Sequence, residues 1–176
     1  MKRQWALVAI GAWLAGTICM STVATENFYT IDRLLEGSQS AAFTAMVQRL
    51  GQPQARDLLR YLSSELNRLY FQMWNVAQLA LGVVTLWLIA RSGRDERGRL
   101  QPARRAVIAM LAIVVLMLVY LTPAIVSLGR SLDFVPRDPA PAGMQRFWIL
   151  HAAYTSLEMI KLLIGAFVAV KLVRRT

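Results

Sequence analysis

Ionisable and polar side chains recur at helical spacing within the otherwise apolar segment 147–170. His151, Tyr154, Glu158 and Lys161 follow at steps of three or four residues, which places them on one face of a helix. Glu158 lies at the middle of this segment, where a lone carboxylate in a bilayer costs about 3 kcal/mol or more. We therefore expect it to be protonated, paired with Lys161, or turned toward polar groups of a neighbouring helix.

A second polar stripe runs into another apolar segment with the same spacing. Its members are Glu65, Arg68, Gln72, Asn75 and Gln78. Asn75, Gln78 and His151 are the candidate partners of Glu158 across a helix interface. Because an ionisable group inside a membrane is a functional-site candidate by default, the two stripes together predict a site that binds a ligand or a proton.

A structural role is the alternative for the same residues. Polar side chains between helices often serve only to hold a bundle together, contributing about 0.5–2 kcal/mol each. Gln72, Asn75 and Gln78 fit this interpretation, and a Glu158–Lys161 pair would serve the same purpose. His151, near the membrane boundary, fits a hydrogen-bonded structural histidine as well as a ligand-binding one.

Composition excludes several classes of protein. The chain has 176 residues, 56% hydrophobic and 17% charged, a balance shifted toward membrane proteins. One Cys and one His exclude an internal disulfide, a CxxC pair, a multi-Cys/His zinc site and a bis-histidine haem from one copy. No nucleophile elbow, metal motif or phosphate loop is present, so we expect a non-enzymatic protein and assign no cofactor. The net charge of +10 lies mostly beside apolar segments, which favours a lipid bilayer over nucleic acid as the partner.

Four segments are long enough to cross a bilayer core of about 30 Å, which takes about 20 helical residues. They are 4–25, 69–90, 106–129 and 147–170. The first three contain no charged residue, whereas the fourth carries Glu158 and Lys161 between basic flanks. We therefore predict an all-α fold in which residues 1–176 form a single membrane domain, a four-helix bundle with a helical hairpin outside the membrane.

Basic residues gather in three segments that four spans would place on one side. They are Lys2 and Arg3; Arg91, Arg94, Arg97, Arg99, Arg104 and Arg105 in the link 91–105; and Lys171, Arg174 and Arg175. The positive-inside rule then makes this link and both termini cytoplasmic. A cleaved signal peptide is the alternative for segment 4–25, but its removal would leave the new N-terminus on the opposite side. The dominance of Arg over Lys hints at a GC-rich bacterial genome, so we expect a bacterial inner membrane.

The outer segment 26–68 predicts a helical hairpin rather than an ordinary loop. We expect the first span to continue to Gly37, which offers a left-handed stop. A short helix over 41–50, capped by Ser40, follows. Pro53 begins a last helix that runs unbroken through the second span. The alternative is a bend at the membrane boundary that lays the outer part of this helix on the bilayer surface.

The proline-rich link after the third span predicts a stiff lid over the outer end of the bundle. Its charged residues are Asp133, Arg137, Asp138 and Arg146, which we expect to pair with one another. The alternative is an ordinary turn whose charges are solvated.

The fourth span also carries a family resemblance. Phe147, His151, Tyr154 and Glu158 give an aromatic residue, a histidine, a small or hydroxyl residue, and a polar residue seven after the histidine. This pattern resembles the last-span signature of the small four-helix membrane proteins grouped with transmembrane protein 205 and its bacterial relatives. The resemblance implies an integral membrane protein and adds weight to His151 and Glu158 as a site. It implies no reaction, because that family has no established biochemical activity.

Two functions follow from these observations, and a third, a membrane enzyme with His151 and Glu158 as base and orienting group, has no supporting sequence motif. The first is a non-enzymatic accessory subunit or a binder of a small amphiphile, such as a quinone or a lipid, whose polar head meets the polar cluster. The second is a small proton-coupled transporter in which Glu158 takes up and releases a proton. A homo-oligomer or a larger membrane complex is compatible with either function.

Overall fold

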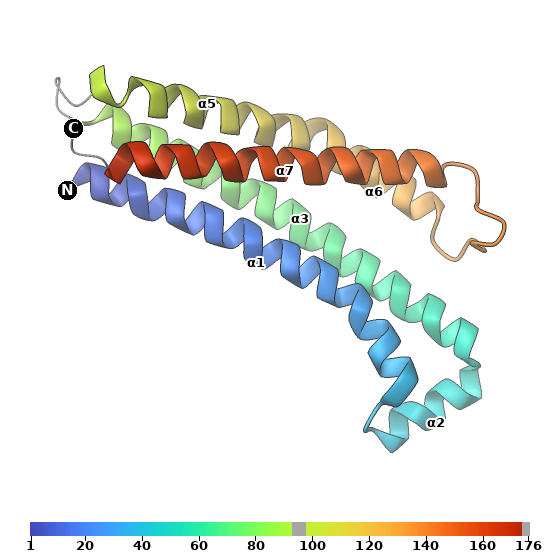
Figure 1. Ribbon diagram of the computed structural model, residues 1–176. Coiled ribbons are helices and arrows are strands. Elements are labelled where there is room, and N and C mark those ends of the chain that lie inside the picture. The colour runs from blue at the N-terminus through green and yellow to red at the C-terminus, as the bar shows by residue number, and fades with distance from the viewer. Residues whose placement is uncertain (93–97, 174–176) are drawn as a thin grey trace.

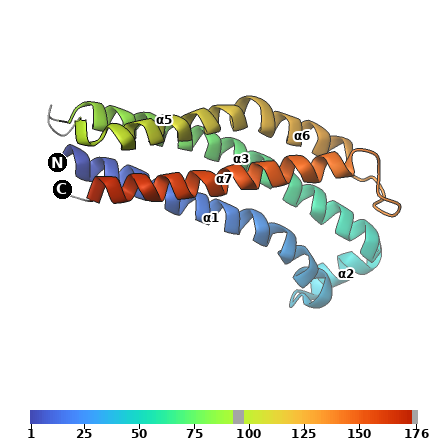
Figure 2. The ribbon, with the colours of Figure 1, turned by 45° about the horizontal axis from the view of Figure 1, so that its top comes forward.

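The computed structural model describes residues 1–92 and 98–173, and every regular element in that part of the chain is helical (Figure 1). The predicted all-α class is therefore confirmed. Four of the basic residues that predicted the orientation, Arg94, Arg97, Arg174 and Arg175, lie outside the described residues. The start of the first helix, Lys2–Gly37, the end of the helix Gln52–Ala90 and the end of the last helix, Met144–Val173, lie at the same end of the molecule (Figures 1 and 2).

Two long helices form an antiparallel pair that extends beyond the rest of the molecule. Helix α1 spans Lys2–Gly37 and α3 spans Gln52–Ala90, with α2, Ala41–Leu50, joining their outer ends. With 36 and 39 residues, the two helices are about 54 and 58 Å long at 1.5 Å per residue, well beyond a bilayer core. Helix α3 is continuous from Gln52 to Ala90, so no break in the helix separates its outer part from the predicted second span.

The connections of this hairpin follow local capping chemistry. The Ser40 hydroxyl accepts a hydrogen bond from the backbone N–H of Phe43 at 3.3 Å and caps α2. Gly51 ends α2 with a φ of +86°, a conformation that favours glycine. The expected left-handed stop at Gly37 is wrong, because α1 ends instead with Ser38 in an extended conformation. The Ser38 hydroxyl accepts from the backbone N–H of Ser40, which turns the chain into α2.

The third long segment contains a wide turn that the sequence did not predict. Helix α5, Gln101–Leu116, passes into the π-helical turn η1, Met117–Leu121, and then into α6, Thr122–Ser131. Pro123 explains this turn: proline has no N–H to donate, and its ring clashes with a carbonyl of the preceding turn of a regular α-helix. The π turn relieves the clash without ending the helix.

Helix α7, Met144–Val173, returns alongside α6, η1 and α5 but does not reach the tip of the α1–α3 hairpin (Figure 1). It packs on α1 and α5, and α3 packs on the same two helices from the other side (Figures 1 and 2). A hydrophobic core fills the interior at the end that carries the termini, with Ile10, Trp13, Val107 and Val168 among its buried members.

Three helical segments are long and apolar enough to cross a membrane. They are Lys2–Gly37, Gln52–Ala90 and Gln101–Ser131. Large apolar side chains such as Val83, Val119 and Leu163 are exposed on the outside, whereas Gln78 and Lys161 are buried inside. Such an apolar exterior around polar interior groups is typical of a protein surrounded by lipid rather than water.

Candidate functional site

A buried polar network joins α1, α3 and α7 midway along the predicted spans. One carboxylate oxygen of Glu158, Oε1, accepts from Lys161 Nζ at 2.9 Å and from Gln78 Nε2 at 3.3 Å. The Gln78 Oε1 accepts from Trp13 Nε1 at 2.8 Å and also from Lys161 Nζ. Lys161 is 1% exposed and Glu158 is 7% exposed, so both charges lie in the interior. We call Trp13, Gln78, Glu158 and Lys161 the central network.

The central network balances its charges but leaves one acceptor without a partner. The formal charges of Glu158 and Lys161 cancel, which removes much of the cost of burying either one alone. The second carboxylate oxygen, Glu158 Oε2, is buried and has no hydrogen-bond partner among the described residues. An unpartnered buried carboxylate oxygen has the lone pairs needed to accept a proton or a donor from a bound molecule.

A second network lies about one helical turn away, toward the outer end. Asn75 Nδ2 donates to the Thr122 hydroxyl at 2.8 Å, and the Tyr154 hydroxyl donates to Asn75 Oδ1 at 3.3 Å. The ring of Phe71 packs against Tyr154 with centroids 5.2 Å apart. This network ties α3 to α6 and α7. Thr122 comes directly after the π turn, so the distortion that accommodates Pro123 immediately precedes the residue that bonds to Asn75 of α3.

The outer end of the molecule is held by charged groups. Arg68 pairs with Glu65 on its own helix and donates two hydrogen bonds to Asp133, at 3.0 and 2.9 Å. Arg130 lies 3.8 Å from Glu65. The expectation that Asp133 pairs within the proline-rich link is therefore wrong, because the nearly buried Arg68 of α3 takes both of its oxygens. The pair fixes this link onto α3 and closes the outer end of the helices.

His151 stands apart from the other predicted residues. Its ring stacks on Phe147, with centroids 4.6 Å apart, and meets Trp148 edge-on at 6.2 Å. Its Nδ1 atom is buried without a hydrogen-bond partner in the described part of the chain. The aromatic contacts hold the ring near the outer end of α7, and no hydrogen bond within the described residues joins it to Glu158. The alternative of a fully hydrogen-bonded structural histidine is therefore not supported, because Nδ1 has no partner among the described residues.

Gln72 also lies outside the buried networks. It is exposed and lines a wide, open groove between α3 and the η1–α6 segment, with a volume of about 610 Å³. The groove residues are Gln72, Val76, Leu118, Thr122, Pro123, Val126, Ser127 and Arg130. We call this feature the α3–α6 groove. Thr122 belongs both to its wall and to the Asn75 network, so the groove reaches the polar interior at that residue.

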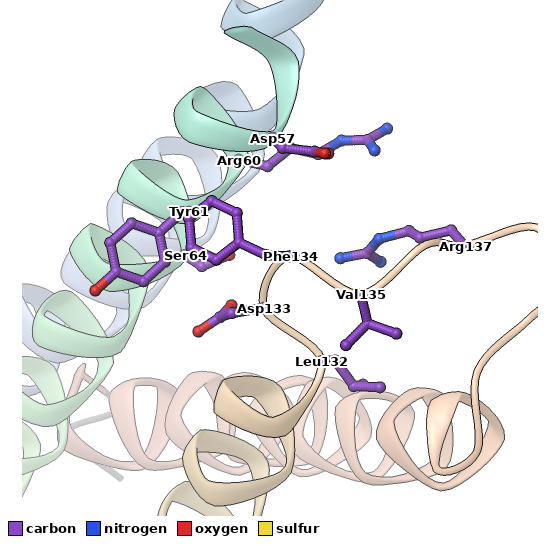
Figure 3. A pocket seen from close by; sticks show the side chains of 9 residues that line it. All are labelled: Asp57, Arg60, Tyr61, Ser64, Leu132, Asp133, Phe134, Val135 and Arg137. Atoms are coloured by element: carbon purple, nitrogen blue, oxygen red, sulfur yellow. The ribbon is translucent and has the colours of Figure 1, made fainter. Parts of the chain in front are cut away.

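A smaller hollow lies farther out, between α3 and the link that follows α6 (Figure 3). It is a shallow hollow with a cavity volume of about 20 Å³, lined by Asp57, Arg60, Tyr61, Ser64, Leu132, Asp133, Phe134, Val135 and Arg137. We call it the outer pocket. Phe134 has a φ of +58°, uncommon for a bulky residue, and its ring lies against Tyr61 with centroids 5.1 Å apart.

The structure thus distributes the nine predicted site residues among separate places. Gln78, Glu158 and Lys161 share one network; Asn75 and Tyr154 share another; Glu65 and Arg68 belong to the outer charged cluster; Gln72 lines the groove; and His151 stands alone. Sequence reasoning missed Trp13 and Thr122. Both are polar-tipped side chains inside apolar spans, and that is the signal that would have included them.

Comparison with known proteins adds no further assignment: no family model, no curated protein and no solved structure matches the chain. Among the described residues, no group of three or more His, Cys, Asp or Glu side chains is arranged to hold a metal ion. The described residues bring together the Glu158–Lys161 and Arg68–Asp133 ion pairs, buried hydrogen-bonding side chains, the α3–α6 groove and the outer pocket.

Proposed function

We propose that the protein is a non-enzymatic, multi-pass membrane protein that binds a small amphiphile, such as a lipid or a quinone, in the α3–α6 groove. The observation that carries this proposal is a wide groove on an apolar exterior that meets polar groups at its wall and at one end. An amphiphile needs this combination, because its apolar part lies along hydrophobic side chains while a few polar groups fix its head.

The groove offers each part of an amphiphile a matching surface. Val76, Leu118 and Val126 line it with apolar side chains. Arg130, at the end of α6, supplies a cation that is 64% exposed and only distantly paired with Glu65. Gln72 adds an amide that can donate and accept hydrogen bonds. An anionic or carbonyl-bearing head at the outer end, with its tail toward the middle of the membrane, satisfies both surfaces.

In this proposal α7 is the fourth span, and the four helices form the bundle of a bacterial inner-membrane protein. The burial of Glu158 and Lys161 against α3 supports a membrane location for α7, because their charges face the interior while Leu163 and Phe167 face outward. The proximity of Lys2 to the end of α3, where its Nζ donates to the Arg91 carbonyl, agrees with a common cytoplasmic side for the basic segments.

The test is to purify the full chain from membranes in mild detergent and measure its native mass. We expect a discrete bound amphiphile that Val126→Trp removes, because the indole fills the groove that Val126 lines. Leu163→Trp is the matched control, since Leu163 is 70% exposed on α7 and lines no part of the groove. Equal retention of the ligand by both variants contradicts the proposal. Co-purifying proteins in stoichiometric amount would instead make the chain an accessory subunit.

A proton-coupled carrier is the second candidate, and the unpartnered Glu158 Oε2 favours it. A carboxylate beside Lys161 at the middle of the membrane can release a proton and regain it as the surroundings change. The measurement is pH-driven proton flux into proteoliposomes, followed with a dye in the lumen. Flux that is lost in Glu158→Gln and retained in Glu65→Gln supports this function. Since Glu158→Gln leaves Lys161 without its counter-charge, the double variant Glu158→Gln/Lys161→Met is assayed beside it.

A further inference from the structure

We propose that the outer pocket is a binding site for a zwitterionic group that combines a phosphate with an ammonium, the chemistry of phosphoethanolamine. The site goes beyond the proposed function, because none of its lining residues lines the α3–α6 groove.

The first observation is a pair of arginines without partners on the two walls of the pocket. Arg60 comes from α3 and Arg137 from the link after α6, and the guanidinium of Arg137 points into the hollow (Figure 3). Neither makes a hydrogen bond or ion pair within the described residues, whereas Arg33, Arg56 and Arg68 each pair with a carboxylate. Two free guanidinium forks on one hollow match the oxygens of a phosphate group.

The second observation is a carboxylate on the same rim. Asp57 lies one turn before Arg60 and has no ion pair in the described chain, although an i,i+3 partner is available. A bare phosphate in the pocket would meet the negative charge of Asp57. A molecule with both signs places its phosphate on the arginines and its ammonium on Asp57, so that all charges are matched.

The aromatic wall suits the same ligand. Phe134 is 60% exposed and holds its ring against Tyr61 beside the hollow (Figure 3). The face of such a ring attracts an ammonium group, and its carbon atoms pack against the CH₂ groups of an alkyl amine. The two hydrogen bonds from Arg68 to Asp133 fix the start of the link, so this wall is already in place before a ligand binds.

The ligand chemistry has two sources, a lipid headgroup or a soluble compound. The lipid source rests on the proposed membrane location, in which Ser64, a lining residue, lies about one turn outside the second span. At that level the headgroups of the outer leaflet would be within reach of Arg60 and Arg137. A soluble phosphoethanolamine would present the same two charges without a lipid tail.

The experiment measures binding to the full chain purified in an uncharged maltoside detergent. The probes are soluble phosphoethanolamine, inorganic phosphate and ethanolamine, titrated by calorimetry or NMR. We expect phosphoethanolamine to bind at least about tenfold more tightly than either fragment, a difference of about 1.4 kcal/mol. Arg137→Gln should weaken it about tenfold, and Asp57→Asn should remove the preference over inorganic phosphate. Arg49→Gln, an equal charge change on α2 away from the pocket, should leave binding unchanged.

Three outcomes overturn the proposal: no binding of phosphoethanolamine, equal weakening by Arg49→Gln, or tighter phosphate binding in Asp57→Asn without any loss of the preference. Thermal unfolding of each variant shows that it is folded. The conservative variant Arg137→Lys keeps the positive charge but lacks the planar guanidinium that binds two phosphate oxygens at once.

An experiment in nanodiscs distinguishes a lipid headgroup from a soluble ligand. Retention of phosphatidylethanolamine over phosphatidylglycerol, lost in Arg137→Gln, assigns the lipid; binding of the soluble compound alone assigns a free ligand. Loss of the groove ligand in Val126→Trp leaves both results unchanged, so the two proposals fail separately.

Discussion

At the scale of single residues, the central network depends on matched burial of opposite charges. Lys161 and Glu158 are tolerated inside because each neutralises the other and because Gln78 hydrogen-bonds to both. Breaking a buried pair on one side is more damaging than removing it entirely, since the remaining charge has no compensation. This asymmetry distinguishes the pair from a surface salt bridge, which contributes little.

We therefore predict that Lys161→Met lowers the free energy of unfolding in detergent by about 3–5 kcal/mol. The double variant Lys161→Met/Glu158→Leu should recover most of that loss, because no charge is then left in the interior. Reversible unfolding of the wild type, both single variants and the double variant gives the coupling energy. Additive losses would mean that the two side chains do not act as a pair.

Two glycines of α1, one of them against a neighbouring helix, give a second prediction at the residue scale. A Cβ at Gly16 would lie 2.2 Å from the Trp74 ring, whereas a Cβ at Gly11 would meet nothing within 4 Å. Gly16→Ala should therefore destabilise the protein by about 1–3 kcal/mol, through forced displacement of a rigid ring. Gly11→Ala, on the same helix, should stabilise it by up to about 1 kcal/mol through helix propensity. Thermal unfolding of the two variants side by side checks the difference in sign.

At the scale of elements, the wide turn η1 sets the position of Thr122. In a regular helix the residues before and after Met117–Leu121 would differ in rotation from those observed, and Thr122 would no longer face Asn75. Pro123 is the residue that makes the regular form unfavourable.

We predict that Pro123→Ala permits the regular helix and weakens the Asn75–Thr122 hydrogen bond. The coupling energy between Asn75→Ala and Thr122→Ala should be about 0.6–1.7 kcal/mol in the wild type and near zero in the Pro123→Ala background. A coupling that is unchanged by Pro123→Ala would show that the turn is held by contacts other than proline.

Much of the element structure could be predicted from sequence, because its signals are local. Ser40, Gly51 and Pro53 mark the ends of α2 and the start of α3, and the observed bounds follow them. The rotation and partner choice of each helix are not local. Thr122 lies in a span that is otherwise apolar, and its pairing with Asn75 depends on a distortion that only the packed helices reveal. For the same reason one spacing pattern on α3 was predicted as a single stripe, although Gln72 faces outward and Gln78 inward.

At the scale of the whole molecule, many large apolar side chains lie on the exterior, as is unusual for a water-soluble protein. Exposed apolar residues surround an interior that contains an ion pair and several amides. Three helical segments have the length and composition to cross a bilayer, and the α1–α3 hairpin continues past the others at the end opposite the termini (Figure 1).

The proposed orientation gives a prediction at this scale. In a Cys19→Ser background, a cysteine at Ser38 should react with a membrane-impermeant maleimide added to intact spheroplasts, because it lies at the outer tip. A cysteine at Gln101, exposed at the opposite end, should react only after the membrane is opened. The reverse pattern of labelling would place both termini outside.

Helix α3 runs without interruption from the hairpin tip at Gln52 to Gln78 in the central network and beyond. The distance between these two residues is about 39 Å at about 1.5 Å per residue. A rod of that length is a lever: a tilt of about 5° at Gln78 displaces the tip by about 3 Å. A change in how Glu158 and Lys161 hold Gln78 would therefore displace the hairpin tip by more than it displaces Gln78 itself.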